Sequence, residues 1–411
     1  MKRSLVRFPI VFFALIGLFI LALIAAFSIP NKSIEWHQEY SMYILQLEEK
    51  WESFGNQYGL HSQPGMPDNS TDRSMMRRTI VEHPEQGAFR SAMSINGYYR
   101  YWHGYQAFLR PLLLFFQIHQ LRWLGQFVFH GLLLAILLLL RRRSLSLPWL
   151  FLAVILCGPI TVIPTSLQFM PAFGTMFAAV IYVLLCAPQR DTQHAAMFFM
   201  IVGMLTSYLD LLTTPLITLG MPLLLCVYLD DESSFSASVR RFLASVFSWG
   251  MGYGLCWAFK WLLAWLCGEN TLQDAVFNHS LFWIKGSEKG VNRLAVVGKN
   301  FHNFFLQHGV RAQIFILIPV VILLLLMIRY PVRLNAAFRK ACLFIPVILS
   351  PYLWYFILAE HSQQHHWFTY RAQIVTLWGI YLMLLSLVDR KKLYAKHQKL
   401  SALFERNPIP N

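Results

Sequence analysis

The feature that most constrains this chain is a series of long apolar segments separated by short basic ones. Phe8–Ile29 is apolar throughout, so it is long enough to cross a bilayer as a helix and longer than the apolar core of a cleaved signal peptide. Nine further segments of this kind follow, at 121–140, 147–165, 170–188, 195–210, 211–229, 242–260, 312–328, 341–359 and 372–388. The pattern predicts an all-α polytopic membrane protein with about ten transmembrane helices.

One part of this span count has an alternative. Asp210 is the only residue that divides 195–210 from 211–229, so one span followed by a re-entrant segment fits this stretch as well. The composition agrees with a membrane protein, because 56% of the residues are hydrophobic and only 13% are charged. We therefore expect residues 1–411 to form a single integral membrane domain.

The basic residues predict the orientation of the spans. They alternate along the chain as the positive-inside rule requires, at Arg141–Arg143, Arg190, Arg240–Arg241, Arg329–Lys340 and Arg390–Lys392. Both termini are then cytoplasmic. Most of the net charge of +15 falls in the segments assigned to the cytoplasm, where it suits binding to anionic membrane lipids rather than to nucleic acid. Because the spans leave no room for a soluble domain, we expect a multi-pass protein of a bacterial plasma (inner) membrane.

This orientation places two large loops outside the cytoplasm. The first, 30–120, contains an expected outer helix at 34–54 and a short apolar stretch at 107–118 that suits an interfacial helix. The second is 261–311, and loops of such length usually carry their own structure or function. The remaining parts are the spans in 121–260, the spans in 312–388 and a cytoplasmic tail at 389–411.

The acidic candidates for chemistry lie in the first outer loop. Asp68 and Asp72 are four residues apart, and a helix that begins near Asn69 would place Asp72 in its first turn with Arg73 beside it. A carboxylate there could act as a general base while Arg73 binds a phosphate. The alternative is a helix cap followed by a solvated basic helix. No metal site is assigned and no cofactor is identified with certainty, although a divalent cation held by these acids stays open.

Other candidates lie in segments that are expected to lie at the membrane surface. Tyr101, Trp102 and His103 could line a sugar and phosphate site, or could simply belong to the interfacial aromatic belt. Arg110 could clamp a phosphate or extend its charge to the interface. Asp210 beside a span is a functional candidate by default. The loop 360–371 adds three further candidates, His365, His366 and Arg371. Contact with phosphate and sugar is favoured for them over metal binding. The alternative is that this loop is a plain hydrophilic connector.

The segments PDNSTDRSMM, YWHGY and HHWFTYR, together with the topology, resemble the GT-C superfamily of polytopic membrane glycosyltransferases of bacterial surface-polysaccharide type. The resemblance implies a GT-C-like fold and a donor sugar carried on a polyprenyl phosphate. It also implies a catalytic acid in the first outer loop, assigned to Asp72 or Asp68. Acids of that family often lie closer to the first span, so Glu35 and Glu39 remain alternatives.

These observations lead to one expected function and two alternatives. The expected activity is an enzyme that transfers a sugar from a polyprenyl-phosphate donor to an extracytoplasmic glycan or lipid acceptor. A transporter or flippase of lipid-linked sugars would use the same polar residues without making a bond. A non-catalytic membrane subunit of a polysaccharide assembly system would need none of them individually.

Overall fold

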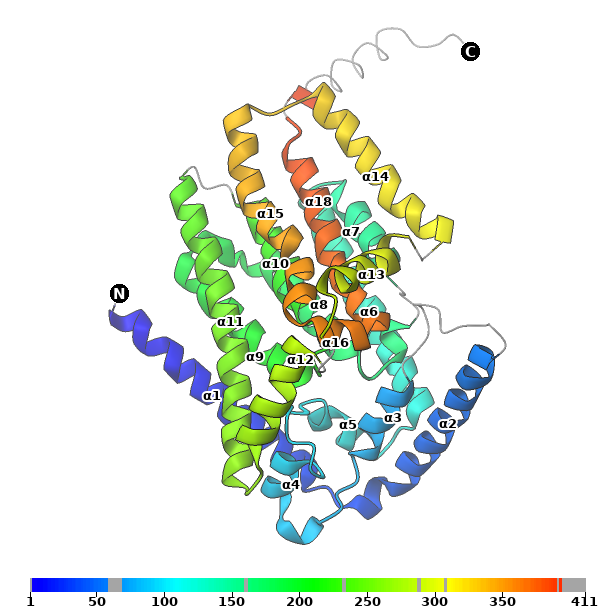
Figure 1. The fold of residues 1–411 in the computed structure, drawn as a ribbon. Helices are drawn as coiled ribbons and strands as arrows, with labels where there is room; N and C mark the ends of the chain where they lie inside the picture. Colours follow the sequence, from blue (N-terminus) through cyan, green and yellow to red (C-terminus); the bar gives the residue numbers. More distant parts are fainter. Residues whose placement is uncertain are drawn as a thin grey trace.

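The computed structural model describes residues 2–57, 69–158, 162–230, 234–286, 290–306, 309–389 and 392–393. Within these ranges the chain is all-helical, and the only β-type pairing is an isolated bridge between Pro331 and Val388. Figure 1 shows the helices arranged as a tall bundle with shorter helices at its lower end.

Five helical segments are long and apolar enough to cross a membrane. They lie in α1 (Lys2–Phe27), α6 (Ile118–Arg141), α11 (Phe235–Leu266), α15 (Leu334–Ile357) and the stretch His366–Ser386 that ends with α18 (Ile374–Ser386). Shorter apolar helices occupy other predicted spans, at α7 (Leu147–Leu156), α8 (Met170–Cys186), α10 (Leu216–Leu229) and α14 (Gly309–Arg329), and α9 (Thr192–Leu209) lies at a further one. The chain is therefore a helical protein suited to a membrane, while the count of about ten spans stays a prediction.

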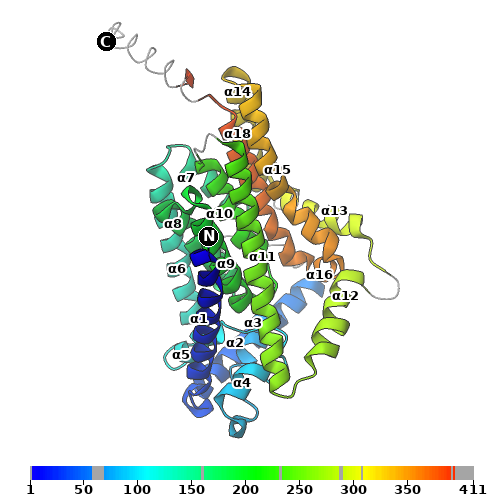
Figure 2. The same cartoon turned by 90° about the vertical axis from the view of Figure 1, so that its left-hand side faces the viewer.

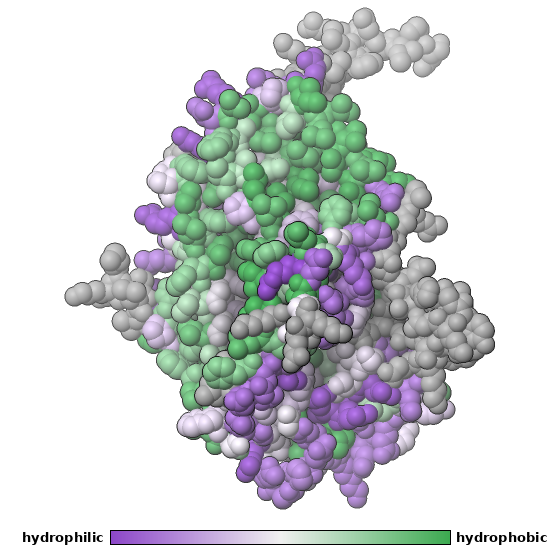
Figure 3. All heavy atoms as spheres, viewed as in Figure 1, coloured by the Kyte–Doolittle hydropathy of each residue, from purple (hydrophilic) through white to green (hydrophobic). Residues whose placement is uncertain are grey.

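The segment between α1 and α6 builds the lower end of the molecule in Figure 1. Its elements are α2 (Asn31–Gln57), α3 (Asn69–Arg77), the short 3₁₀ turn η1 (Pro84–Gln86), α4 (Ala88–Ser94) and α5 (Gln106–Leu112). Helices are thus present at both expected places, 34–54 and near Asn69, while their location outside the cytoplasm stays a prediction. Figure 3 shows hydrophilic residues gathered at this end, below a largely hydrophobic surface. We call it the polar end.

A second set of short elements packs beside the bundle. They are the π-helix η4 (Leu272–Ser280), α12 (Leu281–Lys285), α13 (Arg293–Phe305), α16 (Ala359–Gln364), α17 (His366–Thr369) and the 3₁₀ turn η5 (Tyr370–Gln373). Figure 2 shows α12, α13 and α16 together on one side of the bundle. The two short 3₁₀ turns η2 (Ile163–Thr165) and η3 (Pro188–Arg190) flank α8. A large apolar core, with Trp378 packed edge-on against Phe151, joins α6, α7, α8, α10 and α18.

Glycine allows α9 and α11 to pack with their backbones in close approach. A Cβ on Gly203 would lie 2.2 Å from the Trp249 carbonyl oxygen, and a Cβ on Gly252 would lie 2.2 Å from that of Met200. Small residues of this kind let helices approach in membranes, where packing rather than the hydrophobic effect drives association.

We expect Gly203→Ala to destabilise the protein by about 1–3 kcal/mol, because the added methyl forces α9 away from α11. Gly254 lies on α11, and a Cβ added there would meet nothing within 4 Å, so Gly254→Ala should leave stability equal or higher. Thermal unfolding of both variants in the same detergent measures the difference. Equal melting temperatures would mean that the close contact is not maintained.

Candidate functional site

A polar cavity of about 460 Å³ lies where the two sets of short helices meet. Its walls come from α3, the segment 98–105, the loops before α8 and α10, the end of η4, α12, α16 and α17. The lining residues are Ser70, Thr71, Ser74, Met75, Arg78, Tyr98, Arg100, Tyr101, His103, Tyr105, Gln168, Leu211, His279, Trp283, His361, Gln364, His365 and Phe368. This lining, within the described part of the chain, contains two arginines, four histidines and no carboxylate.

Two arginines meet at one tyrosine ring in this cavity. The guanidinium carbon of Arg78 lies 4.3 Å from the Tyr98 ring centre, and that of Arg100 lies 4.8 Å from it. Arg78 also donates to the Ser74 carbonyl oxygen at 2.9 Å, and an Nη of Arg100 lies 4.0 Å from Asp274. These contacts hold two positive charges in a confined space, which suits an anionic ligand such as a phosphate.

The hydrogen bonds of two histidines determine where each carries its proton. His103 Nε2 lies 2.8 Å from the Tyr98 carbonyl oxygen, which can only accept, so this nitrogen carries the proton and Nδ1 accepts from the Tyr105 hydroxyl at 3.1 Å. In the same way, Arg100 donates to His279 Nδ1 at 3.1 Å, which leaves the proton of the neutral ring on Nε2. Both rings are therefore neutral hydrogen-bonding groups in this arrangement.

Burial keeps these imidazoles neutral. Desolvation, together with the charge of Arg100, lowers the pKa of His279 to about 4. Desolvation also lowers the pKa of His103 well below its usual value, with a further contribution from Arg78, and the pKa of His361 is lowered in the same direction. The positive charge of the cavity thus comes from its arginines near neutral pH.

These pKa shifts predict acid sensitivity. The unfolded histidines bind protons below about pH 6.5, whereas the folded ones do not, so stability is fully present above that pH and falls as the pH drops toward 4. We expect the melting temperature to decrease over this window, and His279→Gln to reduce the decrease. A melting temperature that is constant between pH 6.5 and 4.5 would contradict the neutral, buried state of these rings.

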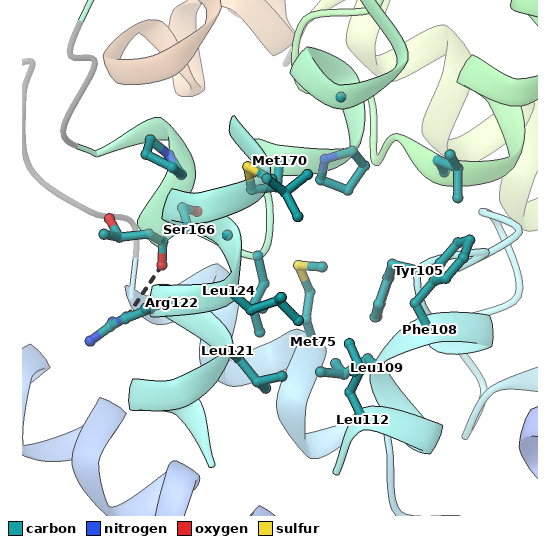
Figure 4. A pocket seen from close by; sticks show the side chains of 18 of the residues that line it. Met75, Tyr105, Phe108, Leu109, Leu112, Leu121, Arg122, Leu124, Ser166 and Met170 are labelled. Atoms are coloured by element: carbon teal, nitrogen blue, oxygen red, sulfur yellow. Dashed lines mark hydrogen bonds between the residues drawn. The ribbon is translucent and has the colours of Figure 1, made fainter. Parts of the chain in front are cut away.

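An apolar groove of about 410 Å³ adjoins the polar cavity. It lies between α5, α6 and the start of α8, and Figure 4 shows Leu109, Leu121 and Met170 pointing into it. Met75 and Tyr105 line both the groove and the cavity. The groove wall also includes the half-exposed side chains of Leu124 and Val128, so the groove opens on the exposed face of α6.

Asp72 holds the loop before α8 in place. Its carboxylate accepts hydrogen bonds from the Ser166 hydroxyl and from the backbone N–H groups of Leu167 and Gln168, each at 3.0 Å. The side chain is fully buried and lies in the first turn of α3. Both carboxylate oxygens are therefore used in joining α3 to the wall of the cavity, and this geometry favours a positioning role. Asp68 lies outside the described residues.

Several other predicted residues serve the packing around the cavity. Trp102 is fully buried and donates to the Cys256 carbonyl oxygen at 2.9 Å. Arg110 is fully buried and donates to the carbonyl oxygens of Ala26, Ile29 and Thr79, which joins α1 to the segment after α3. These side chains stabilise the polar end and are not part of the cavity lining.

The remaining predicted residues fall into two groups. Tyr101, His103 and His365 line the cavity, whereas Arg73, His366, Arg371 and Asp210 are not among its lining residues. Arg371 is buried with its guanidinium 3.9 Å from the centre of the Phe169 ring. Asp210 lies in the loop after α9, next to Leu211 of the cavity wall.

Trp283 of the cavity lining had no signal in the sequence, whereas four further lining residues lie in polar segments that the sequence already indicated, without being ranked as site residues: Arg78, Arg100, His279 and His361. A partial signal existed for His361, because it precedes His365 by one helical turn on α16.

The described residues contain no group of three His, Cys, Asp or Glu that could hold a metal ion. Comparisons with family models, curated proteins and solved structures found no match to this chain.

Proposed function

We propose that this protein transfers a glycosyl unit from a polyprenyl-phosphate donor to an acceptor hydroxyl at the polar end. The observation that supports this proposal is the junction of the arginine-containing cavity with the apolar groove at Met75 and Tyr105. An amphiphile with a phosphate head and a long apolar tail matches such a pair of spaces. A substrate without an apolar part would leave the groove unoccupied.

The chemistry proposed for the cavity is charge stabilisation of the leaving group. The bond between the sugar anomeric carbon and the phosphate oxygen breaks, its electron pair stays on the phosphate, and the acceptor oxygen forms the new bond. Arg78 and Arg100 would hold the additional negative charge on the released lipid phosphate. The acceptor proton passes to a carboxylate base. Asp68 is the sequence-predicted candidate for this base once Asp72 is assigned to positioning, with Glu35 and Glu39 as alternatives.

A turnover assay tests this proposal. Purified protein in lipid vesicles is incubated with a panel of radiolabelled polyprenyl-phosphate sugars and a mixture of hydroxyl-bearing acceptors, beside protein-free vesicles. Release of free polyprenyl phosphate above the protein-free control is the expected result. Saturable binding of the donors without release would instead favour a flippase or an assembly subunit. Absence of binding to every lipid in the panel would overturn the proposal.

A further inference from the structure

The polar cavity has a second wall whose chemistry differs from that of the arginine wall. Trp283 of α12 lies edge-on to His361 of α16, with ring centres 5.1 Å apart, and 5.5 Å from the ring of His365. His365 in turn stacks on Phe368 at 5.1 Å. The segments that meet here are far apart in the sequence. We call Trp283, His361, His365 and Phe368 the aromatic wall.

Two polar atoms of the aromatic wall are buried without a partner. Within the described part of the chain, neither Trp283 Nε1 nor His361 Nδ1 has a hydrogen-bond partner. His361 as a whole is 3% exposed, so its ring is removed from bulk solvent. Buried polar atoms are nearly always hydrogen-bonded, and each one left without a partner costs about 1–3 kcal/mol. Two such atoms in the lining of one cavity indicate a ligand that supplies both bonds.

The types of these atoms define the ligand. The Trp283 N–H can only donate, while a neutral imidazole offers one donor and one acceptor. A phosphate oxygen can only accept, so it matches His361 Nδ1 only when that nitrogen carries the proton. A hydroxyl group both donates and accepts, and several hydroxyls on one ring match several such atoms. Aromatic side chains also provide apolar surface for the C–H groups of a sugar ring.

We propose that Trp283 and His361 form a hydroxyl-binding subsite that holds the sugar of the lipid-linked donor, beside the arginines that hold its phosphate. This inference rests on the proposed function and adds the division of the cavity into two parts. Arg100 connects them, because it contacts Tyr98 on the arginine side and donates to His279, whose ring lies 4.9 Å from that of Trp283.

The test compares two lipids. Binding of polyprenyl phosphate and of a polyprenyl-phosphate sugar is measured for wild type and Trp283→Phe in nanodiscs. Trp283→Phe keeps an aromatic ring and removes the N–H, so we expect about tenfold weaker binding of the glycosylated lipid and unchanged binding of the sugar-free lipid. Trp265→Phe, at a 59% exposed position on α11, is the matched control and should change neither affinity.

His361→Phe provides an independent second variant, with the same selective loss expected, should Trp283→Phe fail to fold. An equal loss for both lipids, or no loss for either, would overturn the subsite. If wild-type protein binds neither lipid, the proposed function itself fails, and the subsite falls with it. Binding of both lipids without discrimination by the two variants rejects the subsite alone and leaves the proposed function standing.

Discussion

Arg78→Ala is expected to reduce turnover of a polyprenyl-phosphate sugar by about 100-fold, since a charge-assisted contact to the leaving phosphate contributes about 1.5–3 kcal/mol. The guanidinium lies over the Tyr98 ring and faces the cavity, with Ser74 as its hydrogen-bond partner on α3. Arg78→Lys should recover part of this activity, because it keeps the charge and loses the planar fork of donors.

Arg77 offers a matched control, because it precedes Arg78 on the chain and is exposed to solvent outside the cavity. Arg77→Ala should keep wild-type turnover. The measurement is the initial rate of polyprenyl phosphate release at several donor concentrations, with a melting temperature for each variant. A wild-type rate for Arg78→Ala, or an equal loss for Arg77→Ala, would remove Arg78 from the phosphate site.

Asp72→Ala is expected to destabilise the protein by about 3–5 kcal/mol, because it removes the buried carboxylate that accepts three hydrogen bonds. The Leu167 N–H then loses its acceptor, and the Gln168 N–H keeps only the Ser166 hydroxyl at 3.2 Å. Asp72→Asn keeps the shape and one acceptor oxygen but points an amide NH₂ toward a backbone donor. Its expected cost is smaller, about 1–3 kcal/mol. These values follow from the positioning role that the three hydrogen bonds of Asp72 indicate.

The general-base hypothesis predicts a different outcome for the same residue. If Asp72 takes the acceptor proton, Asp72→Asn loses turnover while its melting temperature stays near that of wild type. Asp191 provides a control, because it is an exposed carboxylate that accepts a backbone N–H from His194 at the start of α9. Asp191→Asn should cost little, since asparagine is an equally good cap. Thermal unfolding and turnover of all three variants distinguish the two roles.

The local features of the site follow from neighbouring residues and could be predicted. The helix that begins at Asn69, with Asp72 in its first turn, depends on capping chemistry within four residues. The helix α2 likewise follows from the pattern of apolar and charged residues along one segment. Tyr101 and His103 could be selected as candidates because polar aromatic residues next to a span are conspicuous in the sequence alone.

The partners of these residues could not be predicted in the same way. Asp72 binds a loop that is 94 to 96 positions further along the chain, and Arg100 donates to His279 across 179 positions. The sequence separation of these partners does not distinguish either pair from the many other pairs of residues with the same charge or type. Arg110 illustrates the opposite case, a residue whose predicted partner is wrong. Its charge suggested phosphate binding, but its guanidinium donates to three backbone carbonyl oxygens.

Hydropathy and charge by themselves determined that this chain is helical and suited to a membrane, because a bilayer requires long apolar segments whose backbone hydrogen bonds are satisfied within the segment. The tertiary structure alone decided which polar residues share a cavity and which serve as internal supports. That decision depends on the packing of helices distant in sequence, which places a side chain either against a backbone group or in an open space.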